Sequence, residues 1–205
     1  MSKLSAKKIT LISAIITLIS FLYKLGLAYL TMSLVLLIAS ISTLMVFICK
    51  IIFVKSVTKT RDKKKKAYFL MMLSVLIYSS IFILFVVFKI NGIDISNNKE
   101  YEGILGILFI SFLILMVILS IIGLNKALNK TDIVVIGLKE MTFVSVMADL
   151  VIIEEFFSRL IPNYLDIIVL KYLHLYFPLL IGIIMIIVSI SMLVRLIKCD
   201  MLSHL

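Results

Sequence analysis

Apolar residues along this chain form long, almost unbroken runs. Segments such as 34–38 and 183–188 contain no polar side chain, so they lack both the alternation of a strand and the one-sided stripe of a surface helix. Runs of about 20 apolar residues cross a bilayer as helices, because lipid offers no partner for free peptide groups. The pattern predicts an all-α, polytopic integral membrane protein with a single transmembrane domain over residues 1–205. The six predicted spans are residues 9–23, 27–49, 67–88, 104–124, 141–160 and 175–194.

The composition supports this fold class and excludes a soluble globular domain. Hydrophobic residues make up 63% of the 205 residues and charged residues only 16%, so there is too little polar surface to cover a core of this size. Lipid must therefore be the solvent of the outer face.

The predicted spans are joined by short links that group them as three hairpins. The first hairpin closes through the tight link Lys24-Leu25-Gly26. The 15-residue apolar run before this link, with basic residues ahead of it, also fits a secretory signal peptide. Because no small-x-small cleavage site precedes the second span, we interpret the run as an uncleaved signal-anchor.

Basic residues are distributed unevenly between the two sides of this arrangement. If the N-terminus is cytoplasmic, 16 of the 21 Lys and Arg residues fall on the inner side, as the positive-inside rule requires. We therefore expect both termini in the cytoplasm and the protein in the plasma membrane of a bacterium. The inner residues are Lys3, Lys7, Lys8, Lys50, Lys55, Lys59, Arg61, Lys63, Lys64, Lys65, Lys66, Lys126, Lys130, Lys139, Arg195 and Lys198.

The predicted loop KSVTKTRDKKKK contains the densest basic cluster, Lys63, Lys64, Lys65 and Lys66. One interpretation is a stop-transfer and topology signal. The other is attraction to anionic lipid headgroups, at about 1 kcal/mol per basic residue near the surface. The topology accounts for the net charge of +10, and no aromatics interleave with the lysines, so we expect no nucleic-acid partner.

The first span carries a polar stripe. Its members recur at steps of three and four residues, which places them on one helical face. They either bond to a neighbouring helix or form one wall of a polar path. The stripe consists of Thr10, Ser13, Thr17, Ser20 and Lys24.

The fifth span contains an acid near the middle of the bilayer, Asp149, on the same face as Thr142 and Ser145. A charge at this depth costs roughly 3 kcal/mol on insertion scales. We therefore expect Asp149 to stay protonated and to hydrogen-bond to hydroxyls on a facing helix. Ser13 and Thr17 are the candidate partners.

Two more acids lie one to two turns beyond Asp149. Glu154 and Glu155 point to other sides of the helix, so we interpret them as interfacial residues, with Arg159 pairing with Glu155 at i,i+4. The following segment, 161–174, is expected to lie at the outer interface, because prolines flank it and tyrosines can anchor it among the headgroups. Its histidine, His174, is interpreted as interfacial.

The hexapeptide EEFFSR, Glu154 to Arg159, resembles the EExxxR motif of the CAAX-protease-like intramembrane family. That resemblance implies a hydrolytic site that also needs an FxxxH motif and a later HxxxN or HxxxD motif. Here Leu170 replaces the phenylalanine before His174, and Pro178 occupies the fourth position after it. The resemblance covers six residues of 205 and implies at most a degenerate relative.

A second resemblance concerns the whole chain. The segment 137–157, with the lysine-rich and isoleucine-rich composition around it, resembles uncharacterised small six-span membrane proteins of Gram-positive bacteria. It implies the fold and the membrane, but no activity.

The sequence contains no phosphate-binding glycine loop, nucleophile elbow or zinc-ligand pair, so we expect no catalytic residue, metal or cofactor. The leading hypothesis is a non-enzymatic accessory or immunity-like protein that acts through a membrane partner. The alternative is a small transporter or a proton or cation pathway that uses Asp149. A wet path to Asp149 would favour the alternative, and a dry helix contact the leading hypothesis.

Overall fold

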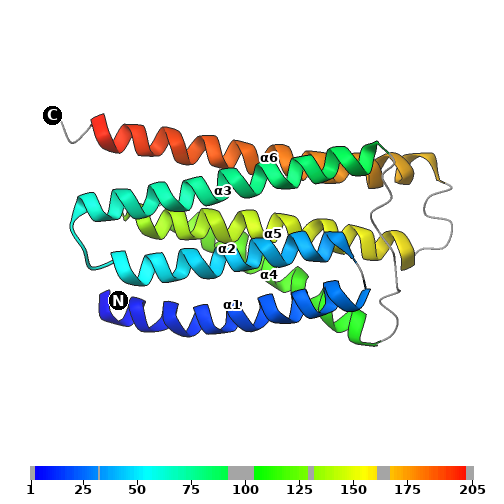
Figure 1. Ribbon diagram of the computed structural model, residues 1–205, viewed down its shortest axis with the longest axis horizontal. Coiled ribbons are helices and arrows are strands. Elements are labelled where there is room, and N and C mark those ends of the chain that lie inside the picture. The colour runs from blue at the N-terminus through cyan, green and yellow to red at the C-terminus, as the bar shows by residue number, and fades with distance from the viewer. Residues whose placement is uncertain (1–2, 32, 92–103, 129–131, 161–166, 202–205) are drawn as a thin grey trace.

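The computed structural model describes residues 3–31, 33–91, 104–128, 132–160 and 167–201, and in these ranges the chain forms six helices and no β-strands. The helices lie roughly side by side along the long axis of an elongated bundle (Figure 1). The all-helical prediction is confirmed. The helices are α1 (Lys3–Thr31), α2 (Leu34–Ser56), α3 (Arg61–Ile90), α4 (Ile104–Leu128), α5 (Ile133–Leu160) and α6 (Ile168–Met201).

Five of the helices have the length and composition of membrane spans. The qualifying segments are Lys7–Leu30, Leu34–Ser56, Arg61–Ile90, Ile110–Leu128 and Ile168–Lys198. The exception, α5, carries six charged residues between Lys139 and Arg159. The architecture is that of an α-helical membrane protein.

The first predicted link is wrong. Lys24-Leu25-Gly26 lies within α1, which ends only at Thr31. Ser33 then caps α2, with its hydroxyl oxygen 3.4 Å from the backbone N–H of Leu36. The prediction of a link here failed because Lys24 was expected to lie between two spans, whereas its side chain is buried inside the bundle.

The basic cluster is also misplaced by the sequence prediction. Lys63, Lys64, Lys65 and Lys66 were expected in a loop, but α3 begins at Arg61 and contains all four. Lysine is a good helix former, and Asp62 in the first turn complements the helix dipole. Helix α3 therefore begins before the apolar segment, and its first turns carry the charged residues.

The predicted interfacial segment is helical where the structure describes it. Helix α6 begins at Ile168 and continues through Pro178, so the predicted start of the last span at residue 175 is wrong. The position of residues 168–174 at the outer interface stays a prediction. Residues 161–166 lie outside the described residues. Proline is tolerated inside a membrane helix because neighbouring helices can satisfy the freed carbonyl groups.

The helices pack around α5, which contacts α2, α3, α4 and α6. By contrast, in the described ranges the backbone of α1 lies close only to that of α2, and the backbone of α4 only to that of α5. The grouping into three hairpins is wrong for its second member, since α3 and α4 make no contact in the described ranges. Helix α3 packs instead on α6, α5 and α2.

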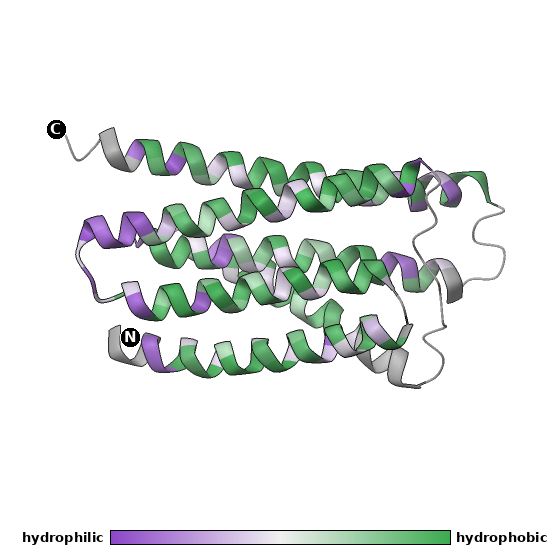
Figure 2. Ribbon diagram, in the orientation of Figure 1, coloured by the Kyte–Doolittle hydropathy of each residue, from purple (hydrophilic) through white to green (hydrophobic). Residues whose placement is uncertain are grey.

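Polar and apolar residues are separated along the bundle axis. The start of α1, the end of α2, the start of α3 and the end of α6 lie at the same end of the bundle (Figure 1). Hydrophilic residues gather near the two ends, and the middle is mostly hydrophobic (Figure 2). Large apolar side chains on the outside, such as Ile16, Ile19 and Ile187, remain exposed as lipid-facing residues do.

Candidate functional site

The candidate site is built on α5, the helix with the most acidic residues and the most neighbouring helices. Met141, Val144 and Val151 on α5 are fully buried against the surrounding helices. A polar side chain on this helix therefore faces protein rather than lipid. That position avoids most of the cost of a charge inside a membrane.

Asp149 forms a buried ion pair with a lysine from the other side of the bundle. Its Oδ1 atom lies 2.5 Å from Nζ of Lys24 on α1, and both side chains are at most 5% exposed. The same ammonium donates to the Thr43 hydroxyl of α2 at 3.1 Å. Three helices thus meet at one neutralised charge pair.

Hydroxyl groups extend this cluster. The hydroxyls of Ser42 on α2 and Ser145 on α5 lie 3.0 Å apart, and both residues are buried. The fully buried Tyr78 of α3 lies beside Ser42 and Asp149. We call Lys24, Ser42, Thr43, Tyr78, Ser145 and Asp149 the central polar cluster.

The predicted partners of Asp149 are elsewhere. Ser13 and Thr17 bind Lys50 of α2, whose Nζ lies 2.8 Å from the Ser13 hydroxyl and also donates to Thr17. Thr142, predicted to share the Asp149 face, donates to the carbonyl of Leu138 on its own helix at 2.8 Å. Of Thr142 and Ser145, which were predicted on the Asp149 face, Ser145 belongs to the central polar cluster.

The polar stripe of α1 contained the signal for the true partner. Lys24 is its last member, and the structure turns that stripe toward α2 and α5, with Thr17 and Lys24 both buried. The sequence located the face but assigned the lysine to a link. An ammonium neutralises the carboxylate better than hydroxyls do, because it supplies a full opposite charge.

A second polar cluster, which the sequence analysis did not identify, lies nearer the end where α3 begins. Glu140 of α5 is 3% exposed, accepts a hydrogen bond from the Tyr68 hydroxyl of α3 at 3.1 Å and pairs with Arg195 of α6. The available signal was that Glu140 and Arg195 are opposite charges at the edges of apolar runs. Nothing in a single sequence says that these two runs are neighbours.

The two glutamates of the EEFFSR segment are separated by the structure. Glu154 lies 3.0 Å from Nδ1 of His174 on α6, so both residues take part in an interhelical contact rather than only facing an interface. Glu155 is buried. The side chain of Arg159 lies outside the described residues, so its pairing with Glu155 stays a prediction.

The four lysines of α3 have different surroundings. Lys64 pairs with Asp132, just ahead of α5, at 2.5 Å. Lys63 and Lys66 are exposed, and Lys65 is partly buried. The cluster therefore includes a structural contact through Lys64 and two exposed lysines, Lys63 and Lys66.

These contacts hold five helices together and leave the mid-bundle acid enclosed. The Asp149 residue is 4% exposed and pairs with Lys24, so the carboxylate has little contact with the surroundings of the bundle. Within the described residues, no group of three His, Cys, Asp or Glu side chains could hold a metal ion.

The fold and the clusters define a class: an α-helical membrane protein whose central helix is tied to its neighbours by buried polar contacts. No known protein family, characterised protein or solved structure shows significant similarity to the chain.

Proposed function

We propose that the chain is a non-enzymatic, multi-pass membrane protein, accessory or immunity-like in kind, that acts by binding a partner protein in the same membrane. The observation that carries this proposal is the burial of Asp149, which is 4% exposed and pairs with Lys24, whose ammonium also donates to Thr43. A transported ion or proton needs an acid that it can reach. Here the acid is engaged in joining α1, α2 and α5.

The proposed topology has six spans, with both termini on the cytoplasmic side of a bacterial plasma membrane. It is supported by the position of the start of α1 and the end of α6 at one end of the bundle, where hydrophilic residues gather (Figures 1 and 2) and where α3 begins with Arg61 and four consecutive lysines, Lys63 to Lys66. The sixth span is α5. Three of its six charged residues, Glu140, Asp149 and Glu154, pair with residues of neighbouring helices, which lowers the cost of placing a charged helix in the membrane.

We place the partner contact on the outer face of α1. In the described ranges the backbone of this helix lies close only to α2, and its spanning segment is 17% buried, the least of the five qualifying segments. Its register is nevertheless fixed by Lys24 and by the bonds from Lys50 to Ser13 and Thr17. A rigid helix with an open apolar face can present Ile12, Ile16 and Ile19 to another membrane helix.

The partner contact can be tested by photo-crosslinking in intact cells. A photoreactive residue at Ile16 or Ile19 is expected to give one protein adduct of defined mass, because a fixed helix face meets its partner in one geometry. The adduct should be lost when Ile12 is replaced by alanine together with whichever of Ile16 and Ile19 does not carry the photoreactive residue. Ile187 of α6 is the matched control, since it is 58% exposed against 59% for Ile16.

Two outcomes would contradict the proposal. One is lipid adducts alone from α1, at the same yield as from Ile187. The other is proton leakage through liposomes that contain the purified protein, provided that Asp149→Asn abolishes it. The second result would support the pathway alternative.

The topology predicts opposite labelling of the two ends of α3. In a background with Cys49→Ala and Cys199→Ala, a cysteine at Lys63 should resist a membrane-impermeant thiol reagent in intact cells, and one at Asn91 should react. The two positions are about 42 Å apart along the helix at 1.5 Å per residue, more than the roughly 30 Å of hydrocarbon. Disrupting the cells should make Lys63→Cys reactive, and the reverse pattern would invert the proposed orientation.

A further inference from the structure

Helix α6 is held to α5 by a contact with an acid near each of its ends. In its last turns Arg195 pairs with Glu140. In its first turns Nδ1 of His174 lies 3.0 Å and 3.1 Å from the two carboxylate oxygens of Glu154. A guanidinium stays charged in proteins, whereas a histidine side chain ordinarily gains or loses its charge between about pH 5 and 8. The two contacts therefore respond differently to protons.

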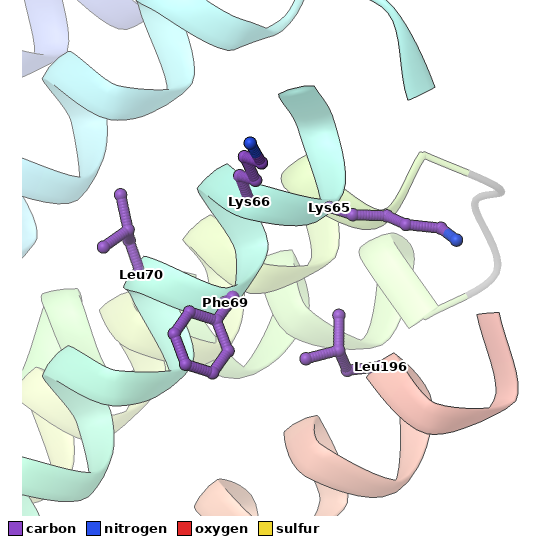
Figure 3. Close-up of a pocket in the computed structure, with 5 residues that line it drawn as sticks. All are labelled: Lys65, Lys66, Phe69, Leu70 and Leu196. Carbon is purple, nitrogen blue, oxygen red and sulfur yellow. The ribbon is translucent and has the colours of Figure 1, made fainter. Parts of the chain in front are cut away.

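The packing of α6 also differs between its two ends. Near Arg195 the helix lies beside the first turns of α3, where Leu196 lines a surface depression together with Phe69 and Leu70 (Figure 3). At the other end, six of the seven residues from 167 to 173 are exposed. These first turns bury little surface of their own, so the contact of His174 with Glu154 contributes much of their attachment to the bundle.

Pro178 separates the exposed turns from a closely packed part of α6. Because proline has no backbone N–H, the carbonyl of His174 cannot receive a helical hydrogen bond from it, and helices bend most readily at such positions. Just beyond it, Gly182 is buried, and a Cβ atom there would lie 2.8 Å from the side chain of Ile83 on α3. Bending would therefore move the turns before Pro178 and leave the rest of α6 in place.

The other ionisable groups at this end of the described helices differ from histidine in their titration range. Helix α6 packs on α3 and α5, which both end where α6 begins (Figure 1). Carboxyl, phenol and ammonium groups ordinarily keep one charge state between pH 5 and 8, which makes His174 the expected sensor. The groups are Glu154 and Glu155 on α5, Lys89 on α3, and Lys171, Tyr172 and Tyr176 on α6; the side chain of Arg159 lies outside the described residues.

We propose that His174 and Glu154 form a pH-sensitive latch that holds the first turns of α6 against α5. A charged imidazole makes a charge-assisted hydrogen bond to the carboxylate, about twice as strong as the bond from a neutral one. The latch is therefore strongest when the pH is acidic, and it weakens as the pH rises through the range in which histidine loses its proton. On release, the segment bends at Pro178, and Val169 and Tyr172 are free to enter the membrane interface.

Electron–electron distance measurements on the spin-labelled full chain in lipid nanodiscs test the latch. Labels on Leu84→Cys of α3 and Val169→Cys of α6, in a background with Cys49→Ala and Cys199→Ala, replace side chains that are 54% and 73% exposed. At pH 5 we expect one predominant distance, and at pH 8 a second one. The ratio of latched to released molecules should fall about fivefold, the difference between a charged and a neutral hydrogen bond. Labels on Leu84→Cys and Ile190→Cys, beyond Pro178, should give the same distance at both pH values.

Three variants assign the response to the latch. His174→Gln should give the same distances at pH 5 and pH 8, because an amide does not titrate in this range. His204→Gln is the matched control, since it removes the other histidine of the chain and should respond as the wild type does. Glu154→Gln keeps His174 but removes its carboxylate, so it should also lose the response, and it provides the test if His174→Gln does not fold. Wild-type distances that are equal at both pH values, or a response that persists in His174→Gln or in Glu154→Gln, would overturn the proposal.

Discussion

Lys24→Met is expected to lower the free energy of unfolding by about 3–5 kcal/mol, which corresponds to a fall of roughly 10 °C in melting temperature. The substitution removes the ammonium but leaves the Asp149 carboxylate in a site where the residue is 4% exposed. A charge without its partner in such a site is the costliest state of a buried pair. The loss should appear as a lower yield of monodisperse protein in detergent and a lower melting temperature.

A double variant separates lost charge compensation from lost packing. Lys24→Met combined with Asp149→Leu removes both charges and should recover most of the lost stability, since apolar replacement of a buried pair is often neutral or favourable. Lys55→Met is the matched control, because Lys55 is exposed on α2 and surface changes are usually within about 0.5 kcal/mol. A Lys24→Met protein as stable as the Lys55→Met protein would show that the pair contributes nothing to folding.

Gly137→Ala should be the most damaging of the glycine-to-alanine changes on α5 and α1. A Cβ atom at position 137 would lie 2.6 Å and 2.9 Å from two ring carbons of Tyr68. That ring cannot easily move away, because Tyr68 is fully buried and its hydroxyl is bonded to Glu140. Overpacking of this kind costs about 1–3 kcal/mol, measured as a lower melting temperature of the purified protein.

Gly26→Ala provides the comparison for this substitution. A Cβ atom there meets nothing within 4 Å, so the change should be neutral or slightly stabilising, as alanine is the better helix former by about 1 kcal/mol. Combining Gly137→Ala with Tyr68→Leu should relieve the clash but leave Glu140 with one partner fewer. Equal melting temperatures for Gly137→Ala and Gly26→Ala would mean that α3 and α5 are less closely packed than described.

The helices were predictable because hydropathy acts locally. A run such as 34–49 is helical in lipid whatever lies beside it, so the fold class followed from the sequence. Helix ends were harder to predict, since α3 begins before its predicted apolar segment and α6 extends beyond its predicted segment at both ends. There, lysines at the start of α3 and Pro178 in α6 had been interpreted as breaks.

The candidate site was only half predictable. Periodicity placed Asp149 and Ser145 on one face and Lys24 on a stripe of α1, because residues on one helix share a face by spacing alone. Partners depend on which helices are neighbours. The packing of α3 on α6, and its separation from α4, cannot be deduced from order along the chain, so the contacts of Glu140 and of Glu154 went unrecognised.

The pairing of Lys24 with Asp149 also affects how the chain is made. The two residues are 125 positions apart, so at about 5–20 residues per second roughly 6–25 s of synthesis separate them. During that interval Lys24 can bond to Thr43 of α2, but the α1–α2 pair lacks the carboxylate that completes its contact. A chain interrupted before α5 would leave this lysine uncompensated, which would mark an unfinished molecule for degradation and make completion of α5 a checkpoint of biogenesis.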